Sequence, residues 1–191
     1  VMPVYERVQK MAEGAAIMAN VDYKISLISG IYEVLVNRSG EEIMQKNLEY
    51  LGNITYTEEE QAFGKKIQEI TKKPQTGMDS KISPLKETKE HPGGGSTDVG
   101  DVSWNVPNIN LSVTVAPKDT PWHSWAVVAC GGMSIGHKGM TYAAKALGMT
   151  ATDLFEDPKL IEKMKTEYKE RKGDEIYEAN IPPGPPPIAD N

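Results

Sequence analysis

A pentapeptide in the C-terminal half of the chain could hold a catalytic serine. Residues 132–136 read Gly-Met-Ser-Ile-Gly, which matches the nucleophile elbow of serine hydrolases, with apolar residues before it and a predicted helix after it. The triad of such enzymes continues with an acid and then a histidine, whereas the histidine after Ser134 is His137, in the adjoining helical turn. Because five-residue patterns recur by chance, we favour a turn at Gly132 and a helix cap at Ser134, with a serine hydrolase as the alternative.

A histidine between two tryptophans is a second candidate. His123 lies in Trp-His-Ser-Trp at residues 122–125, after Pro121 and a predicted strand. A proline-bounded turn fixes the direction of the imidazole and the flanking rings restrict water around it, and both features suit a metal ligand or a general acid. A stacked structural histidine is the alternative. Of the other two histidines, we expect His91 to be solvated and His137 to pack against its helix or cap it, with a functional role for His137 as the alternative.

A glycine-rich turn is the third candidate. Residues 93–101 read Gly-Gly-Gly-Ser-Thr-Asp-Val-Gly-Asp. The run lacks the Gly-Lys-Ser/Thr of a phosphate-binding loop, no strand precedes it as the dinucleotide fingerprint requires, and glycine and valine occupy positions where an EF-hand needs oxygen ligands. What remains is a tight turn that presents Ser96, Thr97, Asp98 and Asp101, with a plain loop as the alternative.

The chain does not contain the pattern of a complete metal site. Zinc needs three or four protein donors, drawn from cysteine, histidine and carboxylates. No second histidine stands at ligand spacing from His123, and the glutamate runs 41–42 and 58–60 fall in the first turns of predicted helices, where acids offset the helix dipole. The sequence therefore predicts part of a metal site at most.

Composition restricts the class of protein. The 191 residues carry a net charge of −6, and 25% are charged and 39% hydrophobic, as in soluble globular proteins. We expect no membrane partner, because no run of about 18 residues is apolar, and no nucleic-acid partner, because the lysines alternate with glutamates. The single cysteine, Cys130, and the absence of a signal-peptide pattern favour the cytoplasm. Because the chain opens on Val1 without an initiator methionine, we expect a fragment or a processed piece.

Hydrophobic periodicity predicts the elements that position these residues. We expect helices at 4–19, 39–51, 58–71, 134–147 and 158–171, and strands at 21–27, 31–36 and 109–115. Ser39 should cap the second helix and Gly52 should end it, a Thr57–Glu60 capping box should start the third, and Gly148 should end the fourth. Asp157 and Pro158 should open the last helix, with the proline in its first turn. The polar, proline-broken stretch 72–92 should be a mobile loop that proteases cut first.

Three segments together resemble a known enzyme family. They are Gly-Gly-Ser-Thr-Asp-Val-Gly-Asp-Val-Ser-Trp at 94–104, Thr-Pro-Trp-His-Ser-Trp at 120–125 and Ser-Ile-Gly-His-Lys-Gly-Met at 134–140. The combined pattern resembles the di-metal amidohydrolase and peptidase family, which includes aminoacylases, carboxypeptidase G and succinyl-diaminopimelate desuccinylase. The resemblance extends back through Ser-Gly-Ile-Tyr at 29–32 into the first helix and covers the chain up to about residue 171.

The resemblance implies an α/β fold of which this chain holds only the C-terminal part. Residues 1–54 would be the end of a two-layer α+β lid and dimerisation domain. Residues 55–171 would be the C-terminal part of a three-layer αβα catalytic domain, with 72–92 as its mobile loop. Residues 172–191 would be a proline-rich tail, extended and exposed, which has no assigned role in the family.

The resemblance also implies roles for individual residues. His123 matches the family's last metal-ligand histidine, and Asn37 matches an asparagine that closes on substrate from the lid. The loop that lines the substrate pocket is matched by Gly95, Ser96, Thr97 and Asp98. The other ligands and the general-base glutamate would lie upstream of Val1, so we expect no general base in this chain and no activity from it alone.

The implied reaction is metal-dependent hydrolysis of an amide bond in an N-acyl amino acid such as p-aminobenzoyl-glutamate. Two divalent ions, zinc or manganese, would lower the pKa of a water that attacks the amide carbonyl. The resemblance further implies a homodimer or a partner hydrolase subunit. A non-catalytic binding or regulatory module of the same fold is the alternative.

Overall fold

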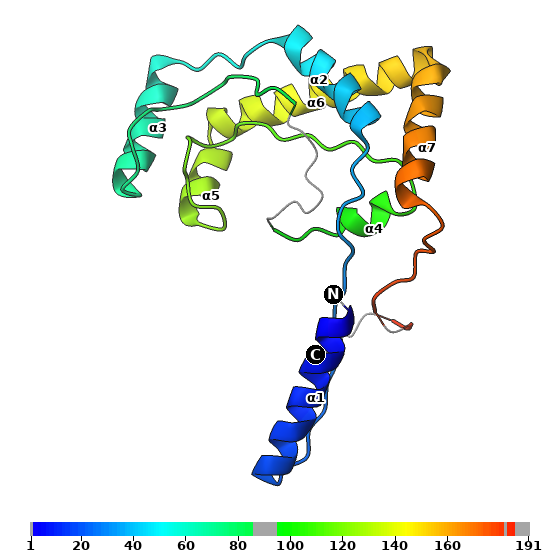
Figure 1. Cartoon of the computed structure of the whole chain (residues 1–191). Helices are drawn as coiled ribbons and strands as arrows, with labels where there is room; N and C mark the ends of the chain where they lie inside the picture. Colours follow the sequence, from blue (N-terminus) through cyan, green and yellow to red (C-terminus); the bar gives the residue numbers. More distant parts are fainter. Residues whose placement is uncertain (1, 86–94, 182, 186–191) are drawn as a thin grey trace.

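The structure, a computed structural model, describes residues 2–85, 95–181 and 183–185. Figure 1 shows a body that contains α2 to α7 and an arm that projects from it, formed by α1 and the segment that follows. We define the arm as residues 2–36. The helices are α1 (Met2–Ala19), α2 (Arg38–Leu51), α3 (Glu58–Ile70), α4 (Val99–Ser103), α5 (Trp125–Gly131), α6 (Ser134–Glu156) and α7 (Pro158–Lys172).

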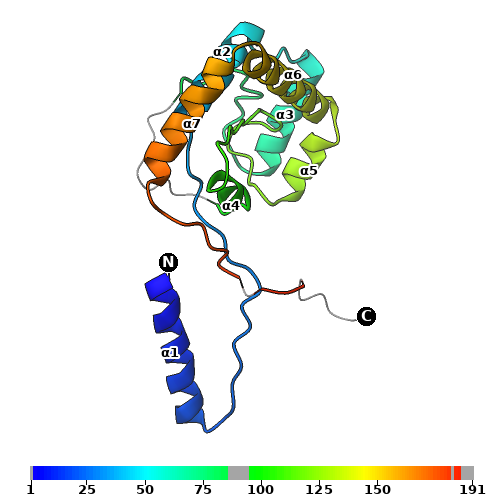
Figure 2. The ribbon, with the colours of Figure 1, turned by 90° about the vertical axis from the view of Figure 1, so that its right-hand side faces the viewer.

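The arm begins with a helix whose apolar side chains are exposed. α1 confirms the helix predicted at 4–19, but Val4, Met11 and Met18 are 63%, 64% and 85% exposed. Apolar residues at spacings of three and four normally form the face that packs on a core. Figure 2 shows instead that α1 stands away from the body, so this face has no helix of the body against it.

The segments predicted as strands form no sheet within the described residues. Residues 21–27, 31–36 and 109–115 have neither helix nor strand. Alternation of apolar and polar residues favours an extended backbone, but a strand also needs a neighbour with which to share hydrogen bonds. The described part of the chain is all-helical, so it does not reproduce the predicted α/β architecture, with its αβα and α+β layers.

α2 begins at a different cap from the one predicted. The N-cap is Asn37, whose side-chain Oδ1 accepts a hydrogen bond from the Gly40 amide at 3.0 Å, and Ser39 lies inside the helix. Asparagine is as good a cap as serine, and Asn37 stands two residues before Ser39. Gly52 ends the helix as predicted, with a φ of 72°.

α6 is longer than predicted and is the central helix of the body. It runs for 23 residues and passes through Gly148, where its end was expected. A Cβ at Gly148 would meet no other atom, so this glycine is simply an exposed helical position. α6 packs against α2, α5 and α7, and the last of these starts as predicted, with Asp157 as its cap and Pro158 at its first position.

Buried apolar residues lie in two regions of the body that are described here. One joins α3 to α5 through Ile67, Ala126 and Cys130, and the other buries Ile43 and Met44 of α2 where that helix packs on α6 and α7. The predicted domain boundary near residue 54 falls between α2 and α3 and stays a prediction.

The first part of the loop predicted at 72–92 is attached to α3. The amide of Gly77 donates to Gln68 Oε1 and the amide of Met78 donates to Gln61 Oε1, each at 2.8 Å, and the Met78 side chain is buried. The glutamines that hold this segment lie on one face of α3, seven residues apart. Residues 86–92 of the predicted loop lie outside the described residues.

Candidate functional site

His123 stands in a turn at the surface, directly before α5. Its φ of 58° places it in the left-handed region, which few residues other than glycine and asparagine adopt. Its imidazole is exposed, and its neighbours Trp122 and Trp125 are 70% and 56% exposed. The rings therefore do not shield it from water as predicted, and the segment before it is not a strand.

The residues around His123 do not form a metal site by themselves. Across residues 2–85, 95–181 and 183–185, no group of three or more histidine, cysteine, aspartate or glutamate side chains is placed to hold an ion. A tightly bound zinc needs three or four donors. The exposed imidazole can supply one of these donors.

Asn37 is a structural residue in this chain. Its side chain is 2% exposed, and its Nδ2 donates to the Met164 carbonyl of α7 at 2.8 Å while its Oδ1 caps α2. The two helices are further joined by Glu167, whose carboxylate accepts from the amides of Arg38 and Ser39 at 2.8 and 2.7 Å. Burial raises the pKa of Glu167, but hydrogen bonds from the Ser39 side chain, from the Ser39 and Arg38 amides and from the Arg171 side chain outweigh it and lower that pKa. Because the side chain is 2% exposed, a substrate contact by Asn37 requires the residues that cover it to move.

The predicted substrate loop is exposed and leads into α4. Gly95, Ser96, Thr97 and Asp98 are all exposed, and Thr97 Oγ1 accepts from the Val99 amide at 3.3 Å. α4 and α5 lie on different sides of the body in Figure 1. Among the described residues, no hydrogen bond or ion pair joins this loop, Asn37 and His123, and their joint role in a substrate site stays a prediction.

A buried carboxylate in α3 forms a polar cluster that sequence reasoning missed. Glu60 accepts from Ser134 Oγ at 2.6 Å through one oxygen and from Lys138 Nζ at 2.6 Å through the other, which also accepts from the Thr57 amide at 2.7 Å. The hydrogen bond from Lys138 and then that from Ser134 hold the pKa of Glu60 near 2, although burial opposes this. The predicted capping box placed Glu60 at the start of α3, and the spacing of four between Ser134 and Lys138 put both on one face of α6.

The cluster also affects a neighbouring tyrosine. Lys138 Nζ donates to the Thr55 carbonyl at 2.9 Å and lies 5.7 Å from the centre of the Tyr56 ring. Burial, and then the charge of Glu60, raise the pKa of Tyr56 to about 12. Tyr56 therefore stays protonated at neutral pH and the cluster keeps one anion and one cation.

Ser134 does not have the surroundings of a catalytic nucleophile. Its hydroxyl donates to Glu60, whose pKa near 2 makes it a weak base. The residues before it form α5, a helix, where a nucleophile elbow needs a strand. Ser134 is the first residue of α6 and Met133 is the N-cap, so the predicted cap at Ser134 was wrong, whereas Gly132 does lie in the turn between the helices. His137 is exposed in the first turn of α6.

We expect Ser134→Ala to lower the free energy of unfolding by about 1 kcal/mol, because Glu60 loses one of its donors. Chemical denaturation of the purified chain measures this. Ser134→Thr keeps a hydroxyl and should lie close to the parent. Covalent labelling of Ser134 by a fluorophosphonate probe would contradict this structural role.

Comparison with known proteins identifies one relative. No known family's sequence profile matches the chain, and no solved structure does. The chain is 30% identical over 207 aligned residues to a protein of Escherichia coli K12, the subunit of p-aminobenzoyl-glutamate hydrolase designated B. The alignment covers 95% of this chain and 43% of that relative. The resemblance seen in the residues is thus confirmed as homology to this p-aminobenzoyl-glutamate hydrolase subunit, of whose length the chain spans less than half.

Proposed function

We propose that this chain is part of a metal-dependent amidohydrolase that cleaves an N-acyl amino acid such as p-aminobenzoyl-glutamate. The observation that carries the proposal is the similarity along nearly the whole chain to a protein named as a p-aminobenzoyl-glutamate hydrolase subunit. The chain itself adds one accessible imidazole, His123, of the kind that binds zinc or manganese.

The surface around His123 supports completion of the site by other polypeptide. Trp122, Trp125 and Val128 are 70%, 56% and 75% exposed, and the last two are three residues apart and share a face of α5. Exposed apolar side chains gathered in one region mark surfaces that another polypeptide covers. More than half of the relative has no counterpart here, which leaves room for the remaining ligands and a general-base glutamate.

The partners and location follow as parts of the same proposal. The relative is named as one subunit of a hydrolase, so we propose a partner hydrolase subunit or a second copy of this chain. In the proposed complex, Asn37 and residues 95–98 contact the substrate. We place the protein in the cytoplasm. Among the described helices, none has both the length and the apolarity to cross a bilayer.

We expect the 191-residue chain alone to bind Zn²⁺ or Mn²⁺ weakly and to release no p-aminobenzoate from p-aminobenzoyl-glutamate, because it supplies too few donors. Metal content after dialysis and a colorimetric assay of the amine check this. An ion that is retained together with turnover by this chain would contradict the incomplete-site proposal.

The function itself is tested in a chimera, in which this chain replaces the aligned part of the Escherichia coli relative. We expect the chimera to hydrolyse p-aminobenzoyl-glutamate, to lose activity on treatment with a chelator and to regain it with Zn²⁺ or Mn²⁺. A chimera that is folded by circular dichroism and retains metal but hydrolyses no amide would favour a binding module instead.

A further inference from the structure

The C-terminal tail returns to the junction between the arm and the body. α7 ends at Gly173, whose φ of 57° turns the chain back. Figures 1 and 2 both show the following residues running beside the segment that leads from the arm to α2. The tail had no assigned role in the sequence, yet it is one of three segments that meet at this junction.

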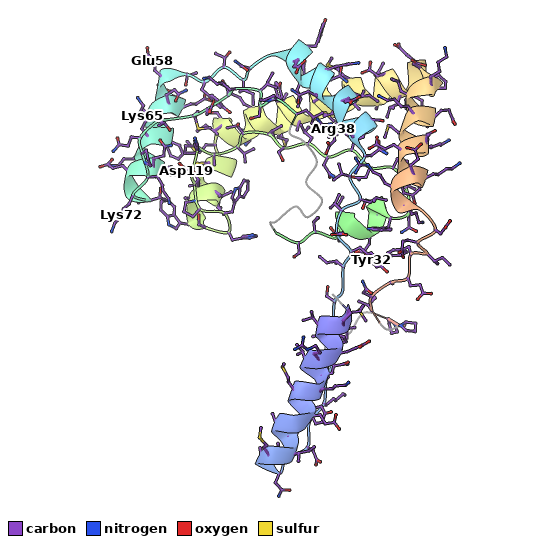
Figure 3. All side chains as sticks on the ribbon, viewed as in Figure 1. Tyr32, Arg38, Glu58, Lys65, Lys72 and Asp119 are labelled. Carbon is purple, nitrogen blue, oxygen red and sulfur yellow. The ribbon has the colours of Figure 1, made fainter. Side chains whose placement is uncertain are left out.

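Tyr177 of the tail contacts both other segments. Its ring centre lies 5.1 Å from that of Tyr32, in the arm, and its hydroxyl donates to Asp101 Oδ1 of α4 at 3.0 Å. That hydrogen bond raises the pKa of Tyr177. Tyr32, which Figure 3 labels beside α4, also packs on Trp104 at 5.5 Å between ring centres. The tail is thus joined to the arm by two rings in tilted contact and to α4 by a hydrogen bond.

The tail also approaches the arm too closely for a side chain to fit between them. A Cβ added to Gly30 would meet the backbone carbonyl oxygen of Asn180 and lie 2.8 Å from the Asn180 Cβ. Both Asn180 atoms are close to the main chain, so they can move only if the tail moves. Glycine at position 30 is therefore what lets the tail lie against the arm.

α4 is held to the same part of the arm by its own hydrogen bonds. Ser103 Oγ accepts from the Leu35 amide at 2.8 Å, and Trp104 Nε1 donates to the Glu33 carbonyl at 2.9 Å. On the other side, Tyr168 of α7 donates its hydroxyl to the Trp104 carbonyl at 2.7 Å. α7 is thus bonded to α4, and α4 is bonded to the arm. The tail, which continues from α7, contacts both α4 and the arm.

We propose that residues 174–181 form a strap that fixes the direction of the arm relative to the body. α1 is largely exposed, so the packing of that helix does not set this direction. The contacts at the junction set this direction instead, and the strap contributes to them through Tyr177 and Asn180. Residues 95–98 lead into α4, and the end of the arm, which the strap contacts, leads into Asn37. The strap therefore also sets the position of residues 95–98 relative to Asn37.

The test measures the arm directly in the full chain. Nitroxide labels at Lys10→Cys on α1 and Lys145→Cys on α6 report the distance across the junction by pulsed electron paramagnetic resonance, and Cys130 is fully buried and stays in place. We expect one narrow distance distribution in the parent and at least a twofold wider one in Tyr177→Ala. Tyr177→Phe keeps the ring contact and should fall between them.

Two further substitutions separate the strap from general damage. Gly30→Val should widen the distribution as much as Tyr177→Ala, because it displaces the tail at Asn180, whereas Gly14→Ala on α1 adds a Cβ into open space and should leave it unchanged. Asp101→Ala removes the acceptor of the Tyr177 hydrogen bond on α4. This variant replaces Tyr177→Ala in the distance measurement if circular dichroism shows Tyr177→Ala to be unfolded. A parent distribution that is already wide, or folded Tyr177 and Gly30 variants that match the parent, would overturn the proposal.

Discussion

His123→Ala in the chimera is expected to reduce hydrolysis of p-aminobenzoyl-glutamate by several orders of magnitude and to reduce retained metal in parallel. In the proposed complex the imidazole is one of three or four donors to an ion, and loss of one donor weakens both binding and catalysis. Turnover and metal content after dialysis are measured on the same samples. The metal measurement distinguishes a lost ligand from a lost substrate contact, which would leave the ion in place.

His137→Ala is the matched control, because it removes a second exposed imidazole from the same region of the chain, at the start of α6. It should retain both metal and activity. Ser134→Ala should retain activity as well, since its hydroxyl is used to stabilise Glu60. An active, metal-loaded His123→Ala protein would overturn the ligand assignment.

Glu60→Ala is expected to lower the free energy of unfolding by about 2 to 3 kcal/mol. The variant loses the capping-box bond to Thr57 and the bonds from Ser134 and Lys138, and leaves the Lys138 ammonium without its carboxylate. Glu59→Ala is the matched control, an exposed glutamate in the same first turn of α3. Denaturation at pH 7 compares the two.

The same carboxylate predicts how stability depends on pH. The pKa of Glu60 lies near 2 in the folded chain against an ordinary value of 4.5, so its ionised form favours folding. This contribution is complete above about pH 4.5 and is lost as the pH falls towards 2. Glu60→Gln should remove that part of the acid sensitivity and Glu59→Gln should not. Equal acid profiles for the parent and Glu60→Gln would contradict the role of the ion pair.

Helices were predictable from this sequence where their caps and periodicity agreed. The capping box at Thr57 and Glu60 and the Asp157-Pro158 start of α7 determine local structure through bonds between neighbouring residues. The end of α6 was not predictable from Gly148, because a glycine ends a helix only where the backbone also turns. The strand predictions were wrong for another reason. Alternation such as that at 21–27 favours an extended backbone, but a strand forms only beside a second strand with which it shares hydrogen bonds, and the described ranges contain no strand.

The candidate site was predictable only as separate residues. The flanking proline and tryptophans single out His123 in the sequence, but its exposure depends on how α5 and the turn before it pack in the fold. In the Glu60 cluster, Ser134 and Lys138 lie 74 and 78 positions from Glu60 along the chain. Nothing in the local sequence around these residues predicts that they come together. Asn37 was predicted as a substrate contact, and its two bonds within the chain depend on α7 returning to α2.

The amide of Asn37 has a consequence for how this protein could respond to a ligand. Its Oδ1 accepts a hydrogen bond from the Gly40 amide at the start of α2, and its Nδ2 donates one to the Met164 carbonyl in the middle of α7. Its Nδ2 and Oδ1 each have a second hydrogen-bonding position, but the side chain is 2% exposed, so a ligand reaches the amide only after the residues that cover it have moved. Binding at residue 37 is therefore linked to a rearrangement where α2 and α7 meet.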